Sequence, residues 1–305
     1  MVRPFLFLCS FLPLVALGDY AWIPKAETLV LKAGWEFLKS DYNFDASGTK
    51  RELTTNSAPT KLSQNQLFLD AEYGLTEFWS GILHTSFLSA QISGIGSTPS
   101  PLSGSGVFDT FLGLKWQVRS EKPVLALESG LVLPPYSTKN LASDELAVGD
   151  GTAGVLVRIH GGTRVKRFAF SLSPGLLFRF GRFSNQVLLD AAVSVTIRKV
   201  YFRLFESSSF SMTKDSNGVF TAENREPGSG GSYSRLATQP DLVSLGFKAG
   251  FFFSPKFRLE VSAAQTVWGN SAADGLRLSL ALISFFDFHK PDEREPISEV
   301  PLNTD

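Results

Sequence analysis

Apolar and polar residues alternate along most of the chain after residue 28. In residues 29–37, every second position is apolar, and the positions between them are mixed. An alternation of period two is typical of a β-strand with two chemically different faces, whereas a helix would repeat every 3.6 residues. The pattern recurs in seven further segments: 66–73, 108–118, 153–160, 189–198, 243–251, 257–263 and 276–282.

Weaker segments of the same kind lie between these, near residues 78–90, 124–133, 167–180 and 199–210. The sequence therefore predicts about twelve strands. Each is close to the roughly 9–11 residues that a tilted strand needs to cross a bilayer. Pro174 interrupts the seventh strand and indicates a bulge, because proline cannot donate a hydrogen bond to the ladder.

The connections between the predicted strands alternate in length. Those at 40–63, 92–106, 134–151 and 208–240 are long, and the one at 268–275 is moderate. The even-numbered connections, such as 74–77 and 119–123, are short. The seventh connection, at 181–186, is the one odd-numbered connection that is not clearly long. This asymmetry favours an all-β fold, an antiparallel transmembrane β-barrel with short periplasmic turns and long extracellular loops. An even strand number places both termini in the periplasm, and closure removes edges that lipid cannot hydrogen-bond. A secreted β-sandwich shares the strands but does not explain the loop asymmetry.

The first eighteen residues have the features of a secretory signal peptide. Arg3 precedes an apolar stretch at residues 5–17, and Ala16 and Gly18 form a small-residue cleavage site. The apolar stretch is too short to span a bilayer as a helix. We therefore expect a signal peptide at 1–18, an outer-membrane barrel at 19–288 and a disordered periplasmic tail at 289–305.

Composition removes several classes of function. The 305 residues include 29 Lys or Arg and 29 Asp or Glu, so net charge does not favour a nucleic-acid partner. The single Cys excludes a disulfide framework and a Cys-based zinc site. We expect no metal and no cofactor; the partners are outer-membrane lipid and a small-molecule solute.

In a barrel, the mixed face of each strand lines the lumen. The candidate lumen-lining residues are Glu36, Asp70, Glu72, His84, Asp109, Lys115, Glu128, Arg158, His160, Asp190, Arg203, Lys248, Arg258, Glu260 and Arg277. Both signs of charge occur, so we expect no strong selectivity from net charge. These residues either border a narrow polar pathway or form a ladder of internal ion pairs that only stabilises the barrel.

Aromatic residues have two expected roles. Inward aromatics would suit a moderately hydrophobic solute or fill the lumen; they are Phe68, Phe111, Tyr201 and Phe205. Aromatics near strand ends would form girdles at the membrane interfaces. These are Tyr73, Trp79, Trp116, Phe168, Phe251, Phe286 and Phe288.

No catalytic residue is assigned from the sequence. A serine hydrolase needs a His beside a reactive Ser and an orienting acid. His84 and His160 both fall on the mixed face, but no GxSxG motif accompanies them. We expect no enzyme, and a membrane-embedded hydrolase remains an alternative.

Several segments resemble the outer-membrane family named for the meta-pathway of phenol degradation. Residues 73–77 (YGLTE) resemble its YGLTD turn, and residues 106–116 (GVFDTFLGLKW) resemble its GxGDxxLGxKY strand. Residues 131–136 (LVLPPY), followed by 148–151 (VGDG), resemble its LPTG…GDG segment. The resemblance implies a channel for aromatic and other small hydrophobic compounds. A looser resemblance links the chain to the fatty-acid channel superfamily, but too few residues precede the first strand for the N-terminal plug domain of those barrels.

The function that these observations favour is passive passage of small, hydrophobic or aromatic solutes across the bacterial cell outer membrane, after signal-peptide-directed export. A closed barrel with a structural role, or with a binding role in the loops at 40–63 and 208–240, is a second hypothesis.

Overall fold

The computed structural model describes residues 21–44, 48–52, 54–55, 58–94, 102–135, 152–180, 184–212, 241–270 and 272–288. The expected signal peptide at 1–18 and tail at 289–305 lie outside these residues and stay predictions. In the part of the chain that is described, no helix has the length and hydropathy to span a membrane.

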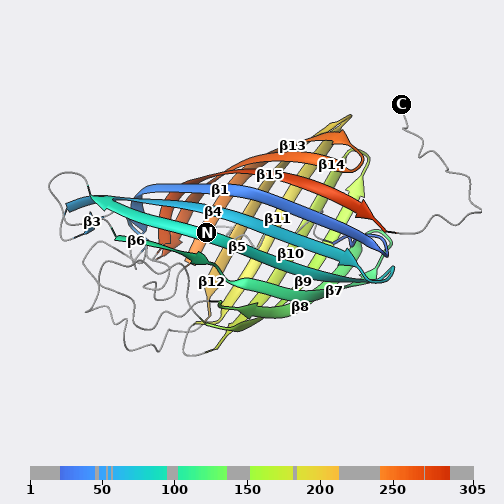
Figure 1. The fold of residues 1–305 in the computed structure, drawn as a ribbon, viewed down its shortest axis with the longest axis horizontal. Helices are drawn as coiled ribbons and strands as arrows, with labels where there is room; N and C mark the ends of the chain where they lie inside the picture. The colour runs from blue at the N-terminus through green and yellow to red at the C-terminus, as the bar shows by residue number, and fades with distance from the viewer. Residues whose placement is uncertain are drawn as a thin grey trace, which may run out of the picture.

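The alternating segments form one antiparallel sheet that closes into a barrel (Figure 1). Among the described residues, twelve strands make its wall: β1 (Thr28–Phe44), β4 (Ala58–Gly74), β5 (Trp79–Gly94), β7 (Thr110–Arg119), β8 (Val124–Leu133), β9 (Gly154–Val165), β10 (Phe168–Arg179), β11 (Gln186–Ile197), β12 (Val200–Ser211), β13 (Asp241–Ser254), β14 (Phe257–Asn270) and β15 (Ala272–Asp287). The predicted all-β antiparallel barrel is therefore confirmed.

Three short strands complete the sheet: β2 (Lys50–Glu52), β3 (Thr54–Thr55) and β6 (Leu102–Val107). The strand β6 pairs with the far half of β5, beyond the part that pairs with β7. It therefore extends the same wall, with residues 108–109 as the break between β6 and β7.

The barrel closes through β1, which pairs with β15 on one side and with β4 on the other. The first and last strands thus meet along nearly their whole length, from Thr28 opposite Asp287 to Phe44 opposite Ala272. No edge of the wall is left without a neighbouring strand among the described residues. Closure of this kind satisfies the backbone groups that an open sheet would expose.

The two ends of the barrel differ. Thr28, Asp287 and the short connections at 75–78, 120–123, 166–167, 198–199 and 255–256 lie at one end, which we call the short-turn end. The other ends of the same strands, such as Phe44, Leu133, Gly154 and Ser211, lie at the opposite end, which we call the long-loop end. Most of the expected loop at 268–275 belongs to strands. β14 ends at Asn270, and β15 begins at Ala272, which pairs with Phe44 of the long strand β1.

The bulge expected at Pro174 is absent from the described ladders. Pro174 pairs with Leu189 of β11, and the ladder to β9 omits Ser173 and Pro174 but resumes in the same register. The strand therefore accepts proline by giving up pairing on one side only.

The outer wall is apolar and bears aromatic residues near both ends. All seven aromatics expected at strand ends are exposed, and they cluster near the short-turn end. Phe178 and Trp268 are exposed near the long-loop end, 10 and 11 residues from Phe168 and Phe257 on the same strands. Ten residues of a strand tilted by about 40° rise roughly 25 Å, which is the height of a transmembrane apolar band.

Candidate functional site: the barrel interior

The inner wall carries the charged side chains, because each strand turns alternate residues inward. Of the fifteen candidate residues, nine are buried: Asp70, Glu72, Lys115, Glu128, Arg158, His160, Asp190, Arg203 and Glu260. The other six are half-buried: Glu36, His84, Asp109, Lys248, Arg258 and Arg277. Asp109 lies in the break between β6 and β7. That these residues line a solute path stays a prediction.

One group of charges joins β4, β5 and β7. Lys115 Nζ lies 3.0 Å from Glu72 Oε1, and Ser80 Oγ donates to the same oxygen at 2.7 Å. On the next inward position of β4, Asp70 contacts His84 Nδ1. Glu72 therefore has partners on β5 and β7, and Asp70 has a partner on β5. These contacts offset the cost of burying the two carboxylates.

His160 lies between a serine and an acid, as in a serine hydrolase, but with its two ring nitrogens exchanged. Its Nδ1 lies 2.9 Å from Ser173 Oγ, and its Nε2 lies 3.0 Å from Glu128 Oε2. However, both His160 and Ser173 are 0% exposed. In this structure a substrate carbonyl has no access to the Ser173 hydroxyl, and the three side chains join β8, β9 and β10.

A further pair links β9 to β11. Arg158 Nη1 lies 3.4 Å from Asp190 Oδ2, and Ser207 Oγ on β12 donates to Asp190 Oδ1 at 3.1 Å. Two side-chain nitrogens of Arg158, Nε and Nη2, are buried and have no hydrogen-bond partner among the described residues.

A second group gathers around Glu260 on β14. Three cations contact its carboxylate: Arg258 Nη2 at 3.0 Å, Lys248 Nζ at 3.4 Å and Lys32 Nζ at 3.5 Å. Tyr201 also donates its hydroxyl hydrogen to Glu260. The Glu260 carboxylate is therefore the shared counter-charge of three basic side chains, from β1, β13 and β14.

Two adjacent cavities lie in the barrel interior, and Glu260 borders the first of them. One, of about 120 Å³, is polar and lies toward the short-turn end. The other, of about 60 Å³, is bordered by the rings of Phe68 and Phe205 as well as by charged side chains. Lys32, Arg203 and Lys248 border both cavities, so the two lie side by side. No group of three or more potential metal ligands occurs among the described residues.

The inward aromatic rings lie against the wall. Phe68 lies opposite Gly34, Tyr201 opposite Gly250, and Phe205 opposite Gly246 in the register of neighbouring strands. A Cβ placed on any of these glycines would approach the opposite ring to 2.4 Å or less. Each ring therefore occupies the space of a side chain that the opposite glycine lacks. A ring that projected toward the barrel axis would fill the lumen, so this arrangement leaves room there.

The N-terminal segment, residues 21–27, crosses the short-turn opening. Thr28 begins β1, whereas Trp22 packs on Gly162 of β9. Around the barrel, β1 and β9 are separated by four strands in one direction and by six in the other. Ala21 is fully buried there, and the Arg164 guanidinium lies 5.8 Å from the Trp22 ring centroid. Although no plug domain precedes β1 in the described residues, this short segment narrows the opening.

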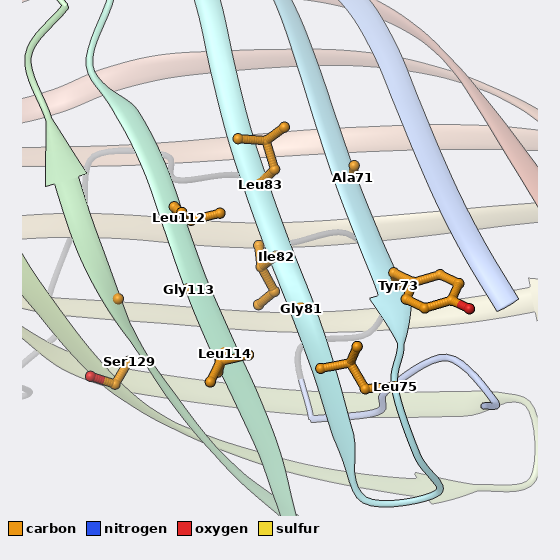
Figure 2. Close-up of a pocket in the computed structure, with 11 residues that line it drawn as sticks. Ala71, Tyr73, Leu75, Gly81, Ile82, Leu83, Leu112, Gly113, Leu114 and Ser129 are labelled. Atoms are coloured by element: carbon orange, nitrogen blue, oxygen red, sulfur yellow. The ribbon is translucent and has the colours of Figure 1, made fainter. Parts of the chain in front are cut away.

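The outer wall has a groove of about 600 Å³ over β4, β5, β7 and β8 (Figure 2). Leu83, Leu112 and Leu114 border it, and Gly81 leaves open space where a side chain would stand. The Phe111 ring closes the inner side of the same wall by packing on Gly113 and Gly130. The groove is therefore an apolar surface that does not open into the lumen through these glycines.

Sequence reasoning missed two parts of this interior. Arg164 continues the inward series of Arg158 and His160 on β9, so extending the alternation past residue 160 would have found it. Trp22 lies outside any alternating segment. Its one signal is Gly162, because a glycine at an inward strand position often marks a close approach of another segment.

Comparisons with known proteins give the class of fold. No protein-family model and no curated protein matches the chain. The structure is similar to an outer-membrane channel from Pseudomonas putida, with a TM-score of 0.62 and 14% identity over 89% of this chain and 100% of that chain. It is less similar to the CymD monoaromatic hydrocarbon channel, with a TM-score of 0.46 and 10% identity over 87% and 90%. A Pseudomonas aeruginosa FadL homologue gives 0.38, with 10% identity over 86% and 90%. The first similarity establishes the outer-membrane β-barrel fold.

Proposed function

We propose that the chain is an outer-membrane channel for passive passage of small solutes, including hydrophobic or aromatic ones. The observation that carries this proposal is the pair of adjacent interior cavities inside a closed, outwardly apolar barrel. Polar groups border these cavities, and Phe68 and Phe205 add apolar surface. A solute with both kinds of surface would find partners for each.

The exterior supports residence in a bilayer, with outer-membrane lipid as the surrounding partner. Outward leucines such as Leu112, Leu278 and Leu280 are 43–55% exposed, and aromatic residues flank them near both ends of the wall. Water would penalise so large an apolar surface, whereas hydrocarbon would not. We place the short-turn end in the periplasm because barrels of this fold class have their short turns there.

Single-channel current across a planar lipid bilayer tests the proposal, using folded protein already shown to insert. We expect reproducible conductance steps. Two neighbouring residues on β14 provide matched variants: Ser262 borders the inner cavity, and Val261 is exposed on the outer wall. Ser262→Trp should reduce the step conductance, because the indole would occupy the cavity, and Val261→Trp should leave it unchanged.

Inserted protein that passes no current would contradict an open aqueous path and favour a structural or loop-binding role. Of the loops in that second hypothesis, 40–63 belongs largely to strands β1, β2, β3 and β4, whereas most of 208–240 lies outside the described residues. If Ser262→Trp and Val261→Trp change the current equally, the ions pass around the barrel and not through it.

A further inference from the structure

The polar cavity beside Glu260 has a strong excess of positive charge. Six basic side chains border it: Lys32, Arg164, Arg167, Arg203, Lys248 and Arg258. Glu260 is the single acidic side chain among its lining residues. This contrasts with the wall of β4, β5 and β7, where Glu72 and Asp70 each contact one base.

Four of the six bases are largely shielded from solvent, whereas Arg164 and Arg167 are exposed. The side chain of Lys32 is 5% exposed, those of Lys248 and Arg258 are 16% exposed, and Arg203 as a whole residue is 7% exposed. Arg258 Nε is buried without a hydrogen-bond partner among the described residues. Buried charges are costly unless opposite charges or hydrogen-bond acceptors accompany them, so an anion that enters this cavity lowers that cost.

The adjoining cavity indicates what kind of anion. It shares Lys32, Arg203 and Lys248 with the cationic cavity and adds Phe68 and Phe205. It also adds one base, Arg277, and two acids, Glu36 and Asp190, so the two cavities together have seven basic and three acidic side chains. A guanidinium is a planar fork that matches the two oxygens of a carboxylate. A compact organic acid could therefore place its carboxylate among the bases and its apolar body against the rings.

We propose that these two cavities form a binding site for a small organic carboxylate, with Arg258 and Lys248 as its main anion-binding residues. This inference deepens the proposed channel function, because it names the solute class of the same lumen. It also replaces the expectation of no charge selectivity: the charges balance over the whole wall but not within this cavity.

Equilibrium dialysis of folded protein in a non-ionic detergent tests the site with three ligands of similar shape: benzoate, benzyl alcohol and benzylamine. Micelles without protein give the background. We expect benzoate to bind about tenfold or more tightly than benzyl alcohol, since hydrogen bonds to charged groups are the strong ones. Benzylamine should bind most weakly. Equal binding of benzoate and benzyl alcohol to the unsubstituted protein would overturn the proposal without any variant.

Variants locate the site. Arg258→Gln or Lys248→Gln should weaken benzoate binding by about tenfold. Glu260→Gln should strengthen it, because it removes the carboxylate that competes for the same bases. A purely structural role for these bases predicts no gain. Lys122→Gln, in the short turn after β7, is the control and should change nothing. Loss of benzoate binding in Glu260→Gln protein that still migrates as a folded barrel would refute the site.

The dialysis result is independent of conduction. Protein that conducts but does not prefer benzoate refutes the carboxylate site and leaves the channel standing. Protein that prefers benzoate but passes no current refutes the channel and keeps the site.

Discussion

At the scale of residues, the interior depends on cross-strand pairs of buried charges. Lys115 and Glu72 have side chains that are 1% and 3% exposed, and each is the other's nearest opposite charge in the described network. Such a pair contributes little net stability, because desolvation offsets the attraction. Removing one partner is different, since the other is then left buried and unpaired.

Lys115→Met should therefore lower the free energy of unfolding by about 3–5 kcal/mol. Denaturant titration of the protein in lipid vesicles measures this value. The double variant Lys115→Met/Glu72→Met should recover much of the loss, because neither charge remains. Lys122→Met in the exposed turn should cost close to nothing. A double variant that is no better than the single one would contradict the pairing.

At the scale of elements, the segment before β1 is held by a glycine on the opposite wall. A Cβ at Gly162 would lie 2.7–2.9 Å from the Trp22 ring and the Ala21 methyl group, which is closer than such atoms pack. The neighbouring Gly161 has room for a side chain, because a Cβ there would have its nearest neighbours at 3.7–3.8 Å.

Gly162→Ala should thus displace Trp22 from β9 and widen the short-turn opening. We expect a larger single-channel conductance than in the unsubstituted protein. Gly161→Ala adds the same methyl group to the same strand and should leave conductance unchanged. Equal conductance in both variants would mean that residues 21–27 do not limit flow.

At the scale of the whole molecule, the outer surface must match the depth profile of a bilayer. Leu280 lies about midway between the two ends of the apolar band on β15, whereas Val165 lies at the short-turn end of β9; both side chains are exposed. A lysine costs most where hydrocarbon is deepest and little where it reaches the interface.

Leu280→Lys should accordingly destabilise the inserted protein by about 2–4 kcal/mol, and Val165→Lys by about 0–1 kcal/mol. The free energy of unfolding from vesicles separates these values. In a water-soluble barrel, both substitutions would be neutral or favourable, so that result would argue against membrane residence.

Much of this architecture could be predicted from the sequence, because a barrel wall imposes its two environments on every strand. Alternation marks Lys115 and Arg158 as inward and Leu112 and Leu280 as outward. The partners could not be predicted: Glu72 lies 43 residues before Lys115, and their meeting depends on the register of three strands. The charge excess at Glu260 could not be predicted for the same reason, since its bases come from several strands: Lys32 lies on β1 and Arg203 on β12, whereas Arg258 lies on β14 itself.

The pairing of the first strand with the last has a consequence for biogenesis. Thr28 and Asp287 meet across the seam, so the seam can form only after all the intervening strands exist. Contacts between residues so far apart in the sequence form slowly, because chain entropy must first be overcome. Until then, β1 and β15 each present an unpaired edge, which hydrocarbon cannot solvate. We therefore expect insertion to be cooperative, with the sheet curling shut late, and a chain lacking β15 to stall before it reaches the membrane core.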